Sequence, residues 1–397
     1  MDTVPRLTKL PETKEVTTTP LLVADMPVTQ ESWIIVLARV RIYDELICKM
    51  VQWTKMKRTV IARLLCRWFY CQLMGRPAAT DDTFFRLSSA SVICAASAKL
   101  QLCLALRFAT LAAQYQLHTV RLLQSSKEEE KKVQIVYADQ APHVSLFLRK
   151  PSVVASEFGH CLISKDKFVH LWERYRHTQH HPDRNQKTPI LFLARVWAML
   201  QRYGLATEDA GLQGALPDAV MEILQKEFGV TCECSAAPTN VHVLNDYCSP
   251  HPDTDCFFGS LGNFLEFKPT HGSFECNPPF GRNEPFMIGM VQHALALCIQ
   301  AEKAKAIMSF VFILPAALDQ DPCRMVLTSD LCRGHLILDY NNHVYKHGHQ
   351  HLFPSTKFVA DFRTVMIWLQ TTAASKKWPV TPTKLEQIVS AFSPHPK

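Results

Sequence analysis

The sequence predicts an α/β fold that is preceded by a mainly helical domain, and two observations lead to this prediction. From about residue 190 onward, short β-rich apolar segments alternate with helical ones, which favours a mostly parallel sheet with crossover helices. Between about residues 31 and 123, apolar residues recur at three- and four-residue spacing with few Gly or Pro, as is typical of helices. The hydrophobic fraction of 47% in 397 residues supports a large core and argues against global disorder.

Composition divides the chain into three parts. Residues 1–30 are rich in Thr and Pro and show no periodicity, so we expect a flexible tail there. We place a mainly helical, substrate-binding domain at 31–188 and the α/β domain at 189–397. A polar run at 125–132 is typical of a solvated loop within the first domain.

Individual elements follow from local patterns. Two short strands are predicted at 133–137 and 144–148. A helix is predicted at 189–203, because Pro189 suits the first helical turn. The α/β domain has five predicted strands, at 230–234, 273–276, 307–314, 335–338 and 364–370.

Charge and cysteine usage limit the classes of function. The net charge of +7 fits a polyanionic partner without requiring one. The 14 Cys show no CxxC…CxxC zinc spacing, and their mostly apolar neighbours are typical of core residues in a reducing compartment. No signal peptide is apparent, so we expect an intracellular protein. The most apolar stretch, at about 90–113, contains Lys99 and Arg107, so we expect a core helix and no membrane partner.

Four histidines lie close together in the sequence and raise the question of a metal site. They are His343, His347, His349 and His351. They have no carboxylate in a standard ligand arrangement, so we expect no metal and leave a histidine-rich surface loop as the alternative.

The segment 273–280 (SFECNPPF) is a predicted strand that runs into a turn. Its two prolines prevent a helix or ladder from continuing and hold φ near about −65°, which stiffens the turn. Ligands of open α/β sheets bind at the carboxyl ends of strands. The sequence therefore predicts a catalytic centre at Asn277-Pro278-Pro279-Phe280.

These four residues suit methyl transfer to an exocyclic amine, whose lone pair is delocalised into the ring. The Asn277 side-chain oxygen and the Pro278 carbonyl would accept the amine hydrogens and help the lone pair to localise, while Pro279 holds the carbonyl rigid. The Phe280 ring offers a face for a flipped or single-stranded base, worth about 1–3 kcal/mol. Taken alone, the motif also fits a proline-stiffened loop that ends in a core Phe.

The chain resembles the cap-specific adenosine N6-methyltransferases of the phosphorylated-CTD-interacting-factor family from about residue 191 to residue 392. The segments that carry this resemblance are 193–203, 211–217, 228–240, 247–262, 272–280, 310–315, 335–338, 345–351 and 378–381. The helical region before about residue 150 is only loosely similar. No WW module is visible ahead of it, so we do not expect binding to the RNA polymerase tail.

The resemblance implies a Rossmann-like class I methyltransferase core that uses S-adenosyl-L-methionine. No GxGxG motif follows the predicted strand at 230–234. The resemblance explains this, because the family has an Ala/Ser-Pro-Asn loop in place of GxGxG. The residues implied in donor binding are Gly211, Leu212, Gln213, Gly214, Ala237, Pro238, Asn240, Phe258, Gly259 and Ser260. Without the resemblance, each of these segments is also typical of an ordinary turn.

Capped RNA is the partner that the resemblance implies. Lys55, Arg63 and Arg67 fall at multiples of four residues on one predicted helix, a spacing that suits phosphate tracking but also an ordinary solvated face. The expected RNA-contacting residues are Lys55, Arg63, Arg67, Arg174, Arg282, Tyr345, Gln350 and His351. Arg282 lies where the family tends to an acidic helix start, which leaves the exact substrate open.

The expected function is therefore N6-methylation of the first transcribed adenosine next to the mRNA 7-methylguanosine cap, in the nucleus, with the cytoplasm left open. The alternatives are an enzyme that acts on internal RNA or DNA adenines, one that acts on protein glutamine, and a non-catalytic capped-RNA-binding module. The row of basic residues Lys55, Arg63 and Arg67 favours a nucleic-acid substrate over protein glutamine, and the intact Asn277–Phe280 motif favours an enzyme.

Overall fold

The computed structural model describes residues 21–25, 47–48, 51–52, 133–149, 157–178, 185, 187–204, 214–280, 285–348, 350–352 and 356–394. The helices predicted between residues 31 and 123 lie outside this set, apart from residues 47–48 and 51–52, which are helical. The described residues form a mixed α/β structure with three sheets.

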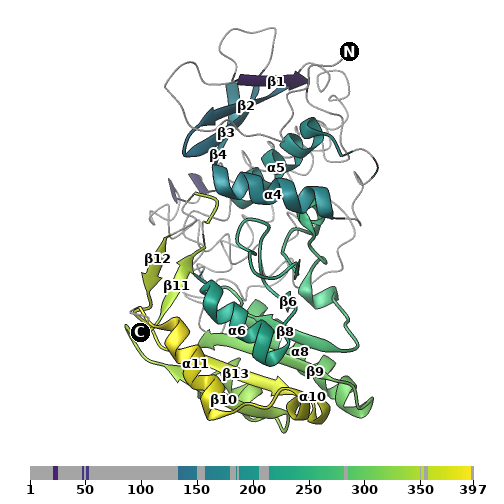
Figure 1. The fold of residues 1–397 in the computed structure, drawn as a ribbon, viewed down its shortest axis with the longest axis vertical. Coiled ribbons are helices and arrows are strands. Elements are labelled where there is room, and N and C mark those ends of the chain that lie inside the picture. Colours follow the sequence, from purple (N-terminus) through teal and green to yellow (C-terminus); the bar gives the residue numbers. More distant parts are fainter. Residues whose placement is uncertain are drawn as a thin grey trace.

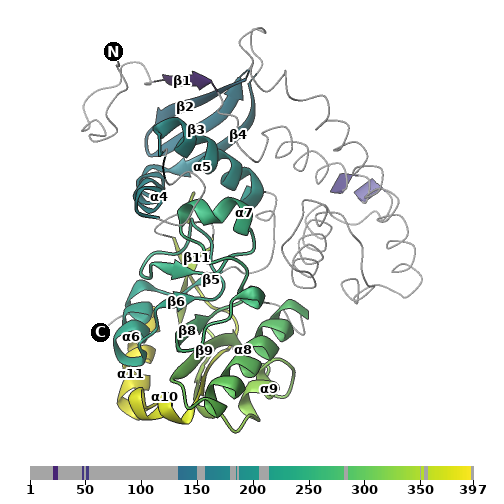
Figure 2. The same cartoon turned by 90° about the vertical axis from the view of Figure 1, so that its right-hand side faces the viewer.

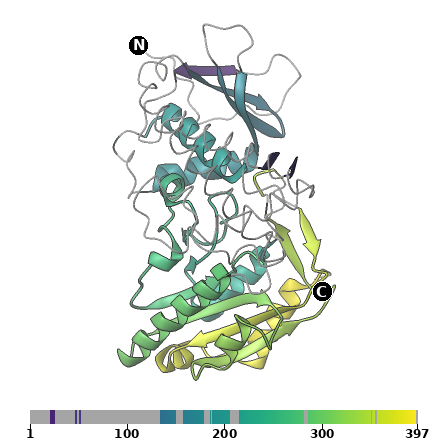
Figure 3. The same cartoon turned by 180° about the vertical axis from the view of Figure 1, so that it is seen from behind.

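A four-stranded antiparallel sheet lies at one end of the molecule and a six-stranded sheet lies at the other (Figures 1 and 3). The strands of the smaller sheet are, in spatial order, β1 (Leu21–Asp25), β2 (Gln134–Gln140), β3 (His143–Arg149) and β4 (Glu157–Ser164). Strands β2 and β3 confirm the two strands predicted here. Strand β1 falls in the expected flexible tail, and its pairing with β2 corrects that expectation for five residues.

Helices α4 (Lys165–His177) and α5 (Pro189–Gly204) pack on this antiparallel sheet. Ser164 is the N-cap of α4, and its side chain accepts a hydrogen bond from the Lys167 backbone N–H. Helix α5 confirms the helix predicted from Pro189, but it shares a core with β2, β3 and β4. The predicted boundary at residue 189 thus precedes a helix that packs with the first sheet; the domain boundaries stay a prediction.

The six-stranded sheet contains all five strands that the sequence predicted for the α/β domain. Its members are β6 (Cys232–Glu233), β7 (Asp246–Tyr247), β8 (Gly272–Cys276), β9 (Met308–Pro315), β10 (Cys332–Leu338) and β13 (Thr364–Gln370). Their spatial order is β10-β13-β9-β8-β6-β7. Strands β7, β6, β8 and β9 pair in parallel, whereas β13 is antiparallel to both of its neighbours.

Helices cover both faces of this sheet (Figure 2). Helices α6 (Asp218–Phe228) and α11 (Pro382–Phe392) pack on one face, and α8 (Pro285–Lys303) and α9 (Cys323–Leu327) on the other. Every residue of β13 is buried, with alternate side chains in the two cores. This double burial explains why the strand is a continuous apolar run rather than an alternating one.

A third, small sheet connects to the functional region. It consists of β12 (Lys357–Val359), β11 (Val344–His347) and β5 (Gly214–Ala215), in that order. Strand β5 lies directly before α6 in the chain and pairs with β11, from which it is more than a hundred residues distant. This pairing places Gly214 beside the end of β8.

Candidate functional site

A cavity opens at the carboxyl ends of β6, β7 and β8. Strand β6 has β7 on one side and β8 on the other, so the chain changes direction across the sheet at this point, where ligands of open α/β sheets bind. Three segments line the cavity: residues 233–237 at the end of β6 and in the loop after it, 248–250 after β7 and 277–279 after β8. Further lining residues are Tyr203, Gly214, Ala215, Asn240, Asn263, Phe264 and Met290.

The orientation of Asn277 is fixed by a hydrogen bond. Its Nδ2 donates to the carbonyl oxygen of Gly214 at 2.8 Å. Because the amide nitrogen is engaged there, the Oδ1 atom remains as an acceptor, the group that the proposed chemistry needs. Asn277, Pro278 and Pro279 all line the cavity, which brings three of the four predicted catalytic residues together.

Gly214 owes its identity to a close approach. A Cβ atom at this position would lie 2.9 Å from the ring of Tyr345, a distance that real Cβ contacts essentially never show. The backbone of β5 can therefore approach β11, and present its carbonyl to Asn277, only without a side chain.

The predicted donor-binding residues separate into three groups. Gly214, Ala237 and Asn240 line the cavity together with Asn277. Gly211, Leu212 and Gln213 lie outside the described residues. The members of the set that are described but do not line the cavity are Pro238, Phe258, Gly259 and Ser260.

Asn240 stabilises the turn that follows β6. Its Oδ1 accepts a hydrogen bond from the Ala237 backbone N–H at 2.7 Å, and its own N–H donates to the Ala237 carbonyl at 3.0 Å. The turn is thus held by side-chain and backbone bonds without the glycines of a GxGxG loop.

Phe258 and Ser260 do not line the cavity, but they pack behind residues that do. The Phe258 side chain is fully buried and packs near Tyr175 with ring centroids 6.4 Å apart, so we assign it a core position rather than a donor contact. The Ser260 hydroxyl lies 2.7 Å from the hydroxyl of Ser249, which does line the cavity. Ser260 therefore contacts the wall from behind.

Phe280 lies partly in the aromatic core. Its ring makes edge contacts with Tyr345 and Phe362, with centroid distances of 5.7 and 5.5 Å. It is half-buried and does not line the cavity, so base stacking by Phe280 stays a prediction.

Tyr345 was expected to contact RNA, but the structure gives its side chain a core position. It is fully buried, it stacks near Phe358 and Phe362, and its hydroxyl lies 3.0 Å from Thr364 Oγ1. Burial raises the pKa of this hydroxyl above its ordinary range. We therefore assign Tyr345 no RNA contact.

Tyr345→Phe tests this assignment. Loss of the buried hydrogen bond to Thr364 should lower the free energy of unfolding by about 1 kcal/mol. The KM for RNA should stay within twofold of wild type, because the hydroxyl does not reach a ligand. Urea denaturation and methyl-transfer kinetics measure the two quantities. A raised KM with unchanged stability would restore the RNA contact.

Arg174 was also expected to contact RNA, but its guanidinium is engaged within the protein. It donates to the carbonyls of Phe258 at 2.9 Å, Leu244 at 3.4 Å and Asn245 at 2.5 Å, and it lies over the ring of Tyr247 at 5.0 Å. These contacts tie α4 to the loops after β6 and β7. Arg174 is therefore assigned a structural role in place of RNA binding.

Of the other residues expected to contact RNA, the structure describes only Gln350 and His351. Lys55, Arg63, Arg67 and Arg282 lie outside the described residues. Gln350 and His351 are buried beside the first sheet, where Ser164 donates its N–H to the His351 carbonyl at 2.5 Å. Among the described residues, neither amide atom of Gln350 has a hydrogen-bond partner.

Sequence reasoning missed Glu233, which lines the cavity at the end of β6. Burial raises the pKa of its carboxyl to about 7, against the opposing effects of Arg174, Lys346 and Lys167. Glu275 is its register partner on β8, and burial raises the pKa of that carboxyl well above its ordinary value. The position of Glu233 at the end of the first predicted strand was a signal that could have identified it.

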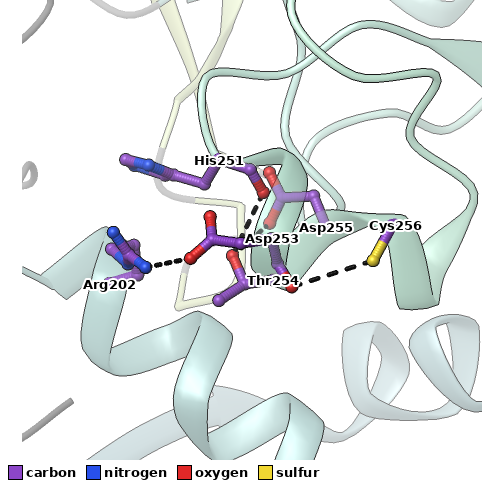
Figure 4. A network of polar contacts seen from close by, with 6 residues as sticks. All are labelled: Arg202, His251, Asp253, Thr254, Asp255 and Cys256. Carbon is purple, nitrogen blue, oxygen red and sulfur yellow. Dashed lines mark hydrogen bonds and ion pairs between the residues drawn. The ribbon is translucent and has the colours of Figure 1, made fainter. Parts of the chain in front are cut away.

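Tyr203 was also missed; it lines the cavity and takes part in a polar network. The Tyr203 hydroxyl donates to Asp255 Oδ2 at 2.6 Å, and Thr254 Oγ1 donates to Asp255 Oδ1 at 3.0 Å. Arg202 forms an ion pair with Asp253 (Figure 4). Because Asp253 and Asp255 belong to α7 (Pro252–Asp255), the network joins the end of α5 to the loop after β7.

Asp255 should give the protein a pH-dependent stability. Burial raises the pKa of its carboxyl from 3.8 to about 7, so the folded state holds the proton more tightly than the unfolded chain does. The free energy of unfolding should therefore fall as the pH rises from about 4 to about 7 and then level off. Urea denaturation should show a smaller fall over this range for Asp255→Asn; equal falls would contradict the assignment.

Two negative observations apply to the described part of the chain. Within it, no group of three or more His, Cys, Asp or Glu side chains is arranged to hold a metal ion. None of the helices described is long and apolar enough to cross a membrane.

The family model described as "Phosphorylated CTD interacting factor 1 WW domain" matches residues 167–348, which run from α4 to β11. This match contradicts our expectation that the chain has no WW module, and it removes the ground on which we did not expect binding to the RNA polymerase tail.

Two curated proteins are similar to the chain over 269 residues. Both are named mRNA (2′-O-methyladenosine-N(6)-)-methyltransferase; the one from Homo sapiens is 35% identical and the one from Mus musculus is 34% identical. Each match covers 65% of this chain but 36% of the relative. The chain thus spans about a third of the length of these relatives.

Proposed function

We propose that this protein transfers a methyl group from S-adenosyl-L-methionine to N6 of the first transcribed adenosine of capped mRNA. The observation that carries the proposal is the Asn277 amide, fixed by the Gly214 carbonyl at the wall of a cavity. The names of the human and mouse relatives supply the substrate class. Capped mRNA also favours a nuclear location.

The sheet supports a Rossmann-like class I methyltransferase core. Its four parallel strands carry crossovers on both sides of β6, and the cavity lies at that switch point. The donor would lie against the loop after β6, where the Glu233 carboxyl suits its ammonium group and Ala237 offers backbone. Tyr203 and Phe264 supply aromatic surface for its base. When bound, the donor supplies an electrophilic methyl group.

The protein's own residues orient the amine. Asn277 Oδ1 accepts one amine hydrogen. The carbonyl of Pro278, the next residue in the chain, accepts the other. With both hydrogens held, the nitrogen lone pair is directed away from the ring plane and toward the methyl group. The rigid Pro278-Pro279 turn keeps these acceptors in place before the substrate arrives. The proton leaves the amine after transfer, so no strong base is needed.

A nucleoside analysis tests the proposed reaction. Purified protein is incubated with radiolabelled S-adenosyl-L-methionine and capped RNA that begins with adenosine, and the RNA is digested to nucleosides. We expect the label in N6-methylated adenosine, with or without 2′-O-methylation. Label in guanosine, in cytidine or in protein glutamine would overturn the proposal.

A further inference from the structure

A cluster of basic side chains lies beside the cavity, between α4 and the loop that follows β6. Lys167, His170 and Arg174 lie on one face of α4, at spacings of three and four residues. That face contacts the loop: His170 Nε2 lies 3.2 Å from the Val241 carbonyl, and Arg174 bonds the carbonyls of residues 244 and 245. Lys346 of β11 is also near, because its charge lowers the pKa of Lys167.

Lys167 differs from the other cations of this cluster. Arg174 has its carbonyl partners, and Lys346 Nζ lies 2.8 Å from Asp218 Oδ1. Lys167 is 6% exposed, yet within the described residues no carboxylate oxygen lies within the 4.0 Å ion-pair distance of its ammonium. A buried charge of this kind is costly unless a counter-ion binds to it.

The cations also affect one another. Burial and the neighbouring Lys346 lower the pKa of Lys167 to about 8, so the ammonium still carries its charge at neutral pH. Burial and Lys167 lower the pKa of His170 to about 4 and also lower that of His242. Asp218 and Glu233 are the acidic groups that act on Lys167 in the opposite direction. An added anion would relieve the repulsion of Lys167 by Lys346 and Arg174.

His242 lies at the exposed edge of the cluster. Its side chain is exposed, and its ring lies 5.5 Å from that of His170. Lys167, His242 and Lys346 do not line the cavity, whereas Glu233 next to them does. The cluster therefore borders the cavity without belonging to it, which suits an anionic part of the RNA rather than the donor.

We propose that Lys167, with His242 and Lys346 beside it, binds a phosphate group of the RNA substrate. The proposal rests on the proposed function, because it takes the RNA to be the ligand of the neighbouring cavity. A phosphate at this position would give Lys167 a counter-ion and would hold the strand while its adenosine enters the cavity.

Lys167→Gln is the direct test, with Lys226→Gln as the matched control. Lys226 is exposed at the end of α6, away from the cluster, and the substitution removes the same charge. We expect Lys167→Gln to raise the KM for capped RNA about tenfold and to reduce the slope of log affinity against log salt concentration by about 0.7. The kcat and the donor Kd should stay within twofold, and Lys226→Gln should change none of them.

Two further variants keep the test independent of folding. Lys167→Arg retains the charge and should keep most of the RNA affinity. His242→Glu places a carboxylate at an exposed position, so it should raise the KM for RNA without affecting the unfolding temperature. Unchanged KM and salt slope for Lys167→Gln would overturn the site. A weaker donor Kd with unchanged RNA affinity would assign the anion to the donor carboxylate and would also overturn it.

Failure of the site and failure of the proposed function give different results. If the wild type transfers no methyl group, RNA filter binding by the wild type and by Lys167→Gln still measures the site. A loss of affinity in the variant would then support the phosphate contact while the function fails. Transfer by both proteins with equal KM would overturn the site and leave the function standing.

Discussion

Asn277→Ala is expected to reduce kcat by about 10²–10³-fold, the usual effect of losing one preorganised polar contact to a reacting group. The variant loses the Oδ1 acceptor that we propose orients the amine, together with the 2.8 Å bond to Gly214. The side chain is half-buried at the cavity wall, so truncation should leave the fold intact. Single-turnover transfer to capped RNA measures the effect on the chemical step.

Asn277→Asp is the matched control for the orientation of the amide. It keeps oxygen acceptors, but an ionised carboxylate has no hydrogen to donate to the Gly214 carbonyl. We expect a large loss of kcat here too, with donor Kd within about threefold of wild type for both variants. Wild-type kcat in Asn277→Asp would show that the bond to Gly214 plays no part, and substantial activity in Asn277→Ala would refute the mechanism.

Gly214→Ala is expected to lower kcat by at least tenfold, although Gly214 does not itself need to touch the RNA. The added Cβ would lie 2.9 Å from the Tyr345 ring, and that ring is fixed in a buried aromatic cluster. Strand β5 must therefore move, and the carbonyl that holds Asn277 moves with it. A small misplacement of a catalytic group commonly costs large factors in rate.

Gly334→Ala provides the control for Gly214→Ala. Gly334 lies on β10, at the edge of the six-stranded sheet and away from the cavity. A Cβ atom added there would lie 3.2 Å from the Val380 side chain. This variant should lose some stability and keep its kcat. If Gly214→Ala retains wild-type kcat at equal stability, the positioning role of Gly214 is wrong.

The sequence predicted five strands of the six-stranded sheet and the residue at which β8 ends, because these depend on local patterns. Continuous apolar runs mark β9 and β13, which helices cover on both faces, and the prolines mark where β8 ends. By contrast, β4 and β1 were not predicted as strands, and the structure does not test the predicted helices before residue 123, which lie outside the described residues apart from residues 47–48 and 51–52.

The contacts that complete the site depend on tertiary pairing, which local patterns do not encode. The bond between Asn277 and Gly214 joins residues 63 positions apart, and it exists because β5 pairs with β11. Arg174 resembled an RNA ligand by composition, but neighbouring loop carbonyls occupy its donors. Tyr345 likewise matched the family segment, yet the sheet directs its ring into the core.

The proposed reaction is best tested by methyl transfer to short RNAs that begin with adenosine. RNAs with a 7-methylguanosine cap, with an unmethylated cap and without a cap are compared, and mass spectrometry locates the methyl group in the first nucleotide. We expect transfer to N6 of the first adenosine of the 7-methylguanosine-capped RNA alone. Equal transfer to uncapped RNA, or no transfer to any of the three despite donor binding, would contradict it.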